Sequence, residues 1–258
     1  MSDRRYEKPA PIKEDVLIEQ QEAQPAEMPA DEVLAPVPAT PYSKAENVVQ
    51  PEVFVVVFSN GEVREKKYFH WMMHHCAKLK LEFFSNPISP DDLLADVKAK
   101  KAEYDLTAGE ETPDTYYTVT DVDHFYNDIV RSKPLYEEEG IRLIISNPCF
   151  EVWLYYSKHE DKFEGFQMPE DRLKLSQMVK QFLNDKIPGG VNPFKAVFDI
   201  KRNIEVARAH YGEDEKGIPV LFATNMFVLA EDVLPYLEAE IVAWKESLSA
   251  VQRQKLPS

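Results

Sequence analysis

Short apolar runs rich in β-branched residues alternate with amphipathic segments in the first half of this chain. The runs lie at residues 53–58, 79–84, 115–120 and 141–145, and a segment with helical spacing of apolar residues follows each of them. Continuous apolar runs of this length are typical of parallel strands that are buried on both faces. The alternation therefore predicts an α/β fold in which helices flank a doubly wound parallel sheet.

The chain beyond residue 160 is predicted to be mostly helical. Three amphipathic segments indicate helices at residues 169–184, 193–211 and 229–250, and a short apolar run indicates one more strand at residues 218–222. Within the first half, the sequence also predicts a helix ending near Tyr104 and another beginning at Pro148, a residue type suited to the first helical position. We expect the C-terminal helices to pack on the sheet. The predicted organisation is a tail at 1–52, an α/β core at 53–160 and a helical part at 161–258.

Residues 1–52 differ in composition from the rest of the chain. They hold eight of its 19 prolines and no glycine, and acidic residues outnumber basic residues eleven to five. A segment of this kind buries too little apolar surface to offset the entropy lost on ordering. We therefore expect a disordered or docking tail.

Composition excludes several classes of protein. A net charge of −15 argues against a protein that coats nucleic acid, although an acidic enzyme can still hold a local path of cations. The eight glycines form neither a dinucleotide-binding fingerprint nor a phosphate-binding P-loop. Two cysteines, no signal peptide and no apolar run of the ~20 residues that a membrane helix needs indicate a cytoplasmic protein without a membrane span.

Carboxylates follow two of the predicted strands. Asp121 and Asp123 come directly after the strand at 115–120, and Glu62 and Glu65 follow the first strand. Ligands of open α/β sheets bind beyond the carboxyl ends of the strands, where the loops meet. Carboxylate oxygens there suit Mg²⁺ or Mn²⁺. The alternatives are that the glutamates only favour a helix N-terminus and that the aspartates only cap a turn.

Other polar residues lie near the same edge of the predicted sheet. Asn147 and Glu151 follow the fourth strand, and Glu151 either contacts the site or is satisfied by backbone donors beside core residues. His124 stands beside the aspartates, where it is a candidate for substrate contact or general acid catalysis. Lys66 and Lys67 are the lysines closest to the first acidic loop, and we expect them to contact phosphates if they are more than a solvated helix face.

Three stretches resemble motifs of one known family. Residues 56–69 resemble the first Toprim motif of RloB-like proteins, and residues 120–124, Thr-Asp-Val-Asp-His, resemble their Asp-x-Asp motif. Residues 146–154, Ser-Asn-Pro-Cys-Phe-Glu-Val-Trp-Leu, resemble the specific signature Ser-Asn-Pro-x-Phe-Glu-x-Trp that follows. The resemblance extends over roughly residues 53–230.

The resemblance implies a Toprim fold, a metal-dependent phosphoryl-transfer site and a role in bacterial anti-phage defence with an AAA- or SMC-like ATPase partner. Glu65 matches the second acid of the family's first motif. Two positions depart from the pattern: Asn60 stands where the family has glutamate, and Ser157 where it tends to have histidine. The Asn60 amide neither accepts a proton usefully nor carries ligand charge. Two such losses in one site would impair catalysis.

The favoured hypothesis is a cytoplasmic nuclease acting on RNA or DNA with Mg²⁺ or Mn²⁺ held by Asp121, Asp123 and Glu62 or Glu65. Glu151 joins the catalytic set, and Asn60, Lys66, Lys67, His124 and Asn147 are the expected substrate-binding residues. The alternative is a catalytically impaired Toprim subunit that binds protein or nucleic acid, and a homo-oligomer is compatible with both. A third interpretation, a general α/β phosphate-handling enzyme, is disfavoured because no glycine-rich loop occurs.

Overall fold

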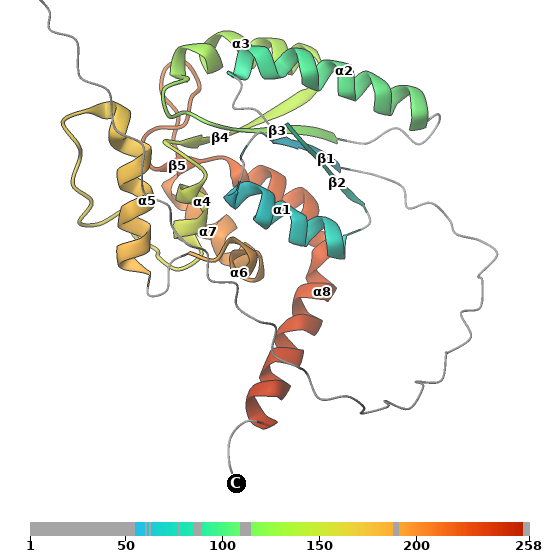
Figure 1. Cartoon of the computed structure of the whole chain (residues 1–258), viewed down its shortest axis with the longest axis vertical. Helices are drawn as coiled ribbons and strands as arrows, with labels where there is room; N and C mark the ends of the chain where they lie inside the picture. Colours follow the sequence, from blue (N-terminus) through green and yellow to red (C-terminus); the bar gives the residue numbers. More distant parts are fainter. Residues whose placement is uncertain are drawn as a thin grey trace, which may run out of the picture. The chain divides into compact units, whose positions relative to one another are not determined.

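Four parallel strands and one short antiparallel strand form a single sheet in the computed structural model (Figure 1). The structure describes residues 55–59, 61, 63–76, 78–84, 89–108, 115–187 and 191–254. The strands are β1 (Val55–Ser59), β2 (Leu79–Phe83), β3 (Thr115–Asp121), β4 (Ile141–Asn147) and β5 (Ala223–Thr224), in the spatial order β2-β1-β3-β4-β5. The predicted α/β class is confirmed, with β5 as an antiparallel edge.

Helices cover both faces of this sheet. Figure 1 shows α2 and α3 on one face and the remaining helices on the other. The first pair is α2 (Pro90–Ala108) and α3 (Tyr126–Glu138). The others are α1 (Arg64–His75), α4 (Glu151–Tyr156), α5 (Leu175–Lys186), α6 (Pro193–Ala196), α7 (Ile200–His210) and α8 (Met226–Gln254), with short 3₁₀ turns η1 (Arg172–Lys174) and η2 (Val197–Asp199).

Burial on both faces explains why the strands read as continuous apolar runs. In β1, Val55 and Val57 pack into the core on the α1 side, and Val56 and Phe58 pack into the core beneath α2 and α3. Successive side chains of a strand point to opposite faces, so a strand covered on both sides is apolar at every position.

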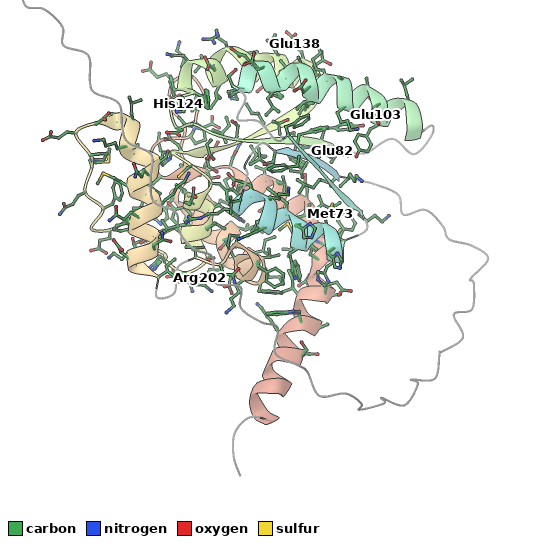
Figure 2. All side chains as sticks on the ribbon, viewed as in Figure 1. Met73, Glu82, Glu103, His124, Glu138 and Arg202 are labelled. Carbon is green, nitrogen blue, oxygen red and sulfur yellow. The ribbon has the colours of Figure 1, made fainter. Side chains whose placement is uncertain are left out.

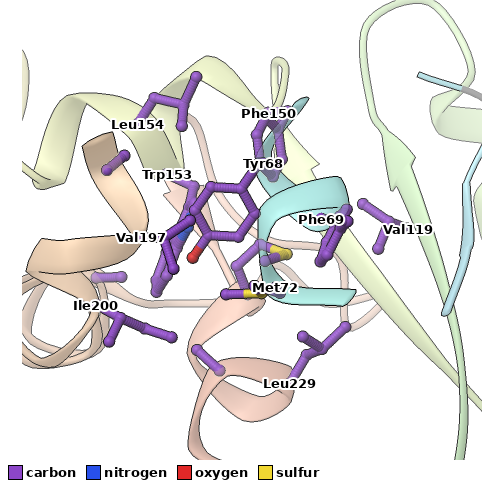
Figure 3. Packing of buried hydrophobic residues seen from close by; sticks show 14 of the residues in the cluster. Tyr68, Phe69, Met72, Val119, Phe150, Trp153, Leu154, Val197, Ile200 and Leu229 are labelled. Atoms are coloured by element: carbon purple, nitrogen blue, oxygen red, sulfur yellow. The ribbon is translucent and has the colours of Figure 1, made fainter. Parts of the chain in front are cut away.

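The helix α4 lies at the centre of the larger core. All six of its residues are buried, and the Trp153 ring packs edge-on against Tyr68 of α1, with 6.4 Å between ring centroids (Figure 3). Leu229 of α8 and Val197 of η2 belong to the same cluster. The C-terminal helices thus pack on the sheet, and all described residues fall in one compact unit.

A side chain at the start of α8 ties the C-terminal part to the sheet. The Asn225 side chain accepts a hydrogen bond from the Ile145 N–H at 2.6 Å and donates one to the Leu143 carbonyl at 3.1 Å. Both partners are backbone groups of β4. Because β5 is only two residues long, Asn225 continues the pairing along the edge of β4 where no further strand does.

Two predictions about the region around β4 are wrong. The helix predicted to begin at Pro148 begins at Glu151, because Ser146 and Asn147 extend β4 by pairing with β5. The strand predicted at residues 218–222 is absent, and the strand in this region is Ala223–Thr224. The apolar character of the segment reflects burial instead, since Ile218 packs under α3.

The helix α2 is longer than predicted. It continues past Tyr104 to Ala108, so the loop expected at residues 105–114 is helical at its start. A salt bridge of 2.8 Å between Lys101 and Asp105, one helical turn apart, stabilises this extension. Its start agrees with the sequence: the Ser89 hydroxyl accepts the Asp92 N–H, as expected of an N-cap before Pro90.

The predicted tail at residues 1–52 lies outside the described residues. None of the helices in the described part of the chain is long and apolar enough to cross a lipid bilayer.

Truncating the central tryptophan should destabilise the fold strongly. Trp153 is fully buried, and replacing a buried aromatic residue with alanine costs about 3–5 kcal/mol of unfolding free energy. We expect this loss for Trp153→Ala in urea denaturation followed by circular dichroism. Leu106→Ala is the control, because that leucine is 84 % exposed and its variant should stay within about 0.5 kcal/mol of wild type. Equal effects of the two variants would contradict the proposed packing.

Candidate functional site

The sheet has a topological switch point between β1 and β3. The chain leaves β1 for β2 on one side and later enters β3 on the other, and α1 and α2 cross on opposite faces. The connections therefore diverge above the carboxyl ends of β1 and β3 and leave a crevice there. A cavity of about 770 Å³ lies at this point. It is lined by Gly61, Val63, Arg64, Glu65, Val119, Thr120, Asp121, Asp123, His124, Phe125, Glu151 and Lys180.

Five of the residues predicted from the sequence line this cavity: Glu65, Asp121, Asp123, His124 and Glu151. They come together because β1 pairs with β3 and β3 pairs with β4, so the segments that follow these strands share one edge of the sheet. These five residues thus come from three separate segments of the chain.

Other predicted residues do not line the cavity. The Lys66 ammonium lies 4.7 Å above the ring centroid of Phe83, and Lys67 is exposed. The Asn147 side chain donates a hydrogen bond to the Pro219 carbonyl at 2.7 Å. Lys66 and Asn147 thus have structural partners of their own, and none of the three residues contributes to the cavity wall. Asn60 and Glu62 lie outside the described residues.

The Glu65 carboxylate folds back over Gly61. A Cβ atom at position 61 would lie 2.2 Å from the Glu65 carboxyl carbon, which is far closer than atoms can approach. A side chain at position 61 would therefore force the Glu65 carboxylate to move away from this place. The absence of a side chain at Gly61 leaves the carboxylate of the first turn of α1 room beside the end of β1.

The carboxyl groups of Asp121 and Glu65 repel each other's charge. Burial raises the pKa of Asp121 well above its usual range, and the charges of Glu65 and Glu151 raise it further. Burial likewise raises the pKa of Glu65 to about 7, although its own backbone N–H opposes the change. One Asp121 oxygen, Oδ1, is buried without a hydrogen-bond partner. Such an arrangement is costly unless a cation or a proton offsets it.

Two basic residues partly compensate these acids, and sequence reasoning missed both. The Glu151 side chain is 6 % exposed, and its Oε1 lies 3.0 Å from Arg64 Nη1 and 3.9 Å from Lys180 Nζ. Burial acts to lower the pKa of Lys180, but the charges of the nearby acids, Glu151 above all, outweigh it and raise the pKa. Lys180 therefore stays charged.

The mouth of the cavity carries a short aromatic and acidic segment. Asp123 has a left-handed backbone with φ of 31°, and its N–H donates to the Pro148 carbonyl at 2.8 Å. His124 lies at the start of α3, toward solvent (Figure 2). Its Nδ1 is 3.5 Å from the Asp123 carboxylate, and its ring lies 4.1 Å from that of Phe125. The side chain of His124 is 57 % exposed and that of Asp123 is 32 % exposed.

Glu65 and Asp121, the acids that we call the floor of the cavity together with Glu151, fit a hard divalent cation. Among the described residues, no three His, Cys, Asp or Glu side chains gather as a ready coordination shell. Mg²⁺ needs no such shell, because it keeps several waters and is commonly held by one or two carboxylates together with substrate oxygens. Glu65 and Asp121 supply two carboxylates, and the unpartnered Asp121 oxygen is available as a ligand.

Comparison with known proteins identifies one family. A family model described as RloB-like protein matches residues 55–216, more than half of the chain. Neither the curated proteins nor the solved structures contained a match. The matched region begins at β1 and includes every residue that lines the cavity.

Removing one acid should stabilise the metal-free protein at high pH. The raised pKa values mean that the folded state binds more protons than the unfolded state between about pH 4.5 and 7, so unfolding free energy falls as pH rises through that window. We expect Asp121→Asn to raise unfolding free energy by about 1–2 kcal/mol at pH 8 with chelator present.

At pH 5 Glu65, with a pKa of about 7, is mostly protonated and no longer repels Asp121, so the gain should be much smaller there. Thermal denaturation at both pH values measures the difference. Glu138→Gln, at an exposed position on α3, serves as the control and should show no such pH-dependent gain. A gain of equal size at both pH values would show that charge repulsion is not its cause.

Proposed function

Because the chain belongs to the RloB-like protein family, we propose that it is a metal-dependent enzyme with a Toprim-type site that cleaves phosphodiester bonds in RNA or DNA. One observation carries the proposal: the buried, unpartnered Asp121 oxygen lies in a cavity shared with Glu65, at the switch point of the sheet. Two cations, Arg64 and Lys180, line the same cavity. A cavity with both acids and cations suits a metal ion and an anionic substrate bound together.

Glu65 and Asp121 would hold Mg²⁺ or Mn²⁺, and Asp123 and Glu62 complete the predicted ligand set. The ion, when bound, supplies Lewis acidity toward the phosphate and the attacking water. In the reaction a water oxygen bonds to phosphorus while the bond from phosphorus to the leaving oxygen breaks. The water proton passes to a carboxylate of the site, and His124 at the mouth gives a proton to the leaving oxygen.

The family resemblance supports a biological setting for this chemistry. RloB-like proteins are associated with anti-phage defence and with AAA- or SMC-like ATPases, so we propose a cytoplasmic effector that works with such a partner. The protein carries a net charge of −15, which repels nucleic acid in general. An ATPase partner that delivers or gates the substrate is compatible with a body of this charge.

A second candidate function is a catalytically impaired subunit that binds protein or nucleic acid. Asn60 favours it, because an amide stands where the family motif has a glutamate. Calorimetric titration with Mn²⁺ separates the two functions. Absence of measurable binding favours the impaired subunit, whereas binding without cleavage followed by a large gain of cleavage in Asn60→Glu indicates a decayed catalytic site.

Cleavage should depend on both the metal and the floor acids. The assay incubates the full chain, alone and with an AAA- or SMC-like ATPase from the same source, with total RNA and with plasmid DNA in Mn²⁺. We expect EDTA to abolish cleavage and Asp121→Asn to lower the rate by about 100-fold or more. Glu138→Gln should cleave like wild type. Wild-type activity in the Asp121 variant, or none from the wild type under any condition, would rule out the proposed function.

Adding a single methyl group at the floor should weaken the metal site. In Gly61→Ala the new Cβ would displace the Glu65 carboxylate, which lies 2.2 Å from that position. We expect Mn²⁺ affinity to fall by about tenfold in calorimetry, the size typical of losing support for a metal ligand. Gly212→Ala is the matched control, because its Cβ would meet only Val220 at an ordinary 3.6 Å. Unchanged affinity in Gly61→Ala would contradict a metal site that depends on the Glu65 carboxylate lying over Gly61.

A further inference from the structure

We propose that Lys180 and Arg64 form the phosphate-binding pair of this cavity and that Glu151 positions the pair instead of holding the metal. The inference rests on the proposed function, because it assigns the substrate contacts of the same site. It moves Glu151 out of the catalytic set and brings in a residue from the helical C-terminal part of the chain.

The contacts of the three carboxylates separate their roles. A single oxygen of Glu151, Oε1, faces both Arg64 at 3.0 Å and Lys180 at 3.9 Å. Asp121 instead has a buried oxygen with no hydrogen-bond partner. A carboxylate already compensated by two cations attracts a metal ion less than one left uncompensated. The ion is therefore expected at Asp121 and Glu65, and Glu151 remains with its cations.

The two cations keep donors free for a ligand. Lys180 Nζ is 3.9 Å from Glu151, beyond hydrogen-bond range, and its side chain is 47 % exposed in the cavity wall. Arg64 Nη1 contacts Glu151 without an aligned hydrogen bond. A lysine ammonium has three N–H donors and a guanidinium five. Both groups therefore have unused N–H bonds at the cavity, which suits the oxygens of a phosphate.

The charge balance of the cavity floor supports the same assignment. A bound divalent ion favours the ionised forms of Glu65, Asp121 and Glu151, whose three negative charges then stand against the single charges of Arg64 and Lys180 and the double charge of the ion. The sum is one positive charge, equal and opposite to the charge of a phosphodiester. Asp123 lies nearer solvent, with 32 % of its side chain exposed, where water screens its charge. The ion-loaded floor should therefore attract a phosphodiester.

The helix α5 is anchored well enough to place its lysine. Val179 and Leu183, on either side of Lys180 in the sequence, are fully buried in the core that α5 shares with α4. Glu151 begins α4, so the same packing that joins the two helices sets the distance between Glu151 and Lys180. A positioning role for Glu151 follows from this geometry.

The test uses three variants of the full chain and one control. Lys180→Ala removes the ammonium, Lys180→Arg keeps the charge, and Glu151→Gln removes the positioning charge without changing the shape. The control is Lys186→Ala on the same helix, where the ammonium lies 5.4 Å from the Phe182 ring centroid and outside the cavity lining.

Two measurements separate metal binding from phosphate binding. Calorimetry gives the Mn²⁺ affinity, and fluorescence anisotropy in Ca²⁺ gives the affinity for a short labelled single-stranded DNA. We expect Lys180→Ala and Glu151→Gln to weaken DNA binding by about tenfold while Mn²⁺ affinity stays within about twofold. Lys180→Arg should recover most of the loss, and Lys186→Ala should match wild type. In cleavage, the Lys180→Ala loss should appear mainly in KM.

The outcomes distinguish this inference from the proposed function. If Glu151→Gln abolishes Mn²⁺ binding, or if Lys180→Ala binds DNA as wild type does, the assignment of roles is overturned even though cleavage stands. If the wild type does not cleave, the proposed function fails, and the DNA-binding arm still decides whether Lys180 contacts phosphate. Equal losses in Lys186→Ala would show a general charge effect and would also overturn the inference.

Discussion

The parallel pairing of β1 with β3, in which Ser59 lies opposite Val119, determines which residues line the cavity beyond the ends of these strands. It brings the turn after β1, with Gly61 and the first residues of α1, to the edge where Asp121 ends β3. The chain then crosses on opposite faces of the sheet, so no helix covers this junction. Every charged residue of the cavity is placed by this register or by a helix packed against it.

The cavity floor gives up some stability by keeping two acids close together. Asp121 and Glu65 share a partly buried space in which neither ionises without cost, and the pKa values of both carboxyl groups are raised. A core built only for stability would pair both acids or replace them with apolar residues. Here only Glu151 is fully compensated, by Arg64 and Lys180. The remaining acids would gain from any cation placed between them.

The sequence predicted much of this arrangement, and its failures have physical causes. The alternation of apolar runs with amphipathic segments predicted the sheet. The rule that ligands bind beyond the carboxyl ends of strands singled out Glu65, Asp121 and Glu151. Both inferences depend only on local sequence pattern. Lys180 lies far along the chain on an amphipathic helix, where a lysine beside a buried stripe looks like any solvated residue. Only tertiary packing brings it to Glu151. The strand predicted at 218–222 failed because burial alone produces the same apolar run.

The side-chain pairing of Asn225 with β4 bears on where a foldable piece of this protein ends. The region matched by the family model stops at residue 216, before β5, Asn225 and the buried face of α8. A recombinant fragment cut at that boundary would keep every cavity residue, yet it would expose the edge of β4 and the apolar surfaces that α8 covers. The region that matches the family thus ends before the part of the chain that completes the sheet and the core.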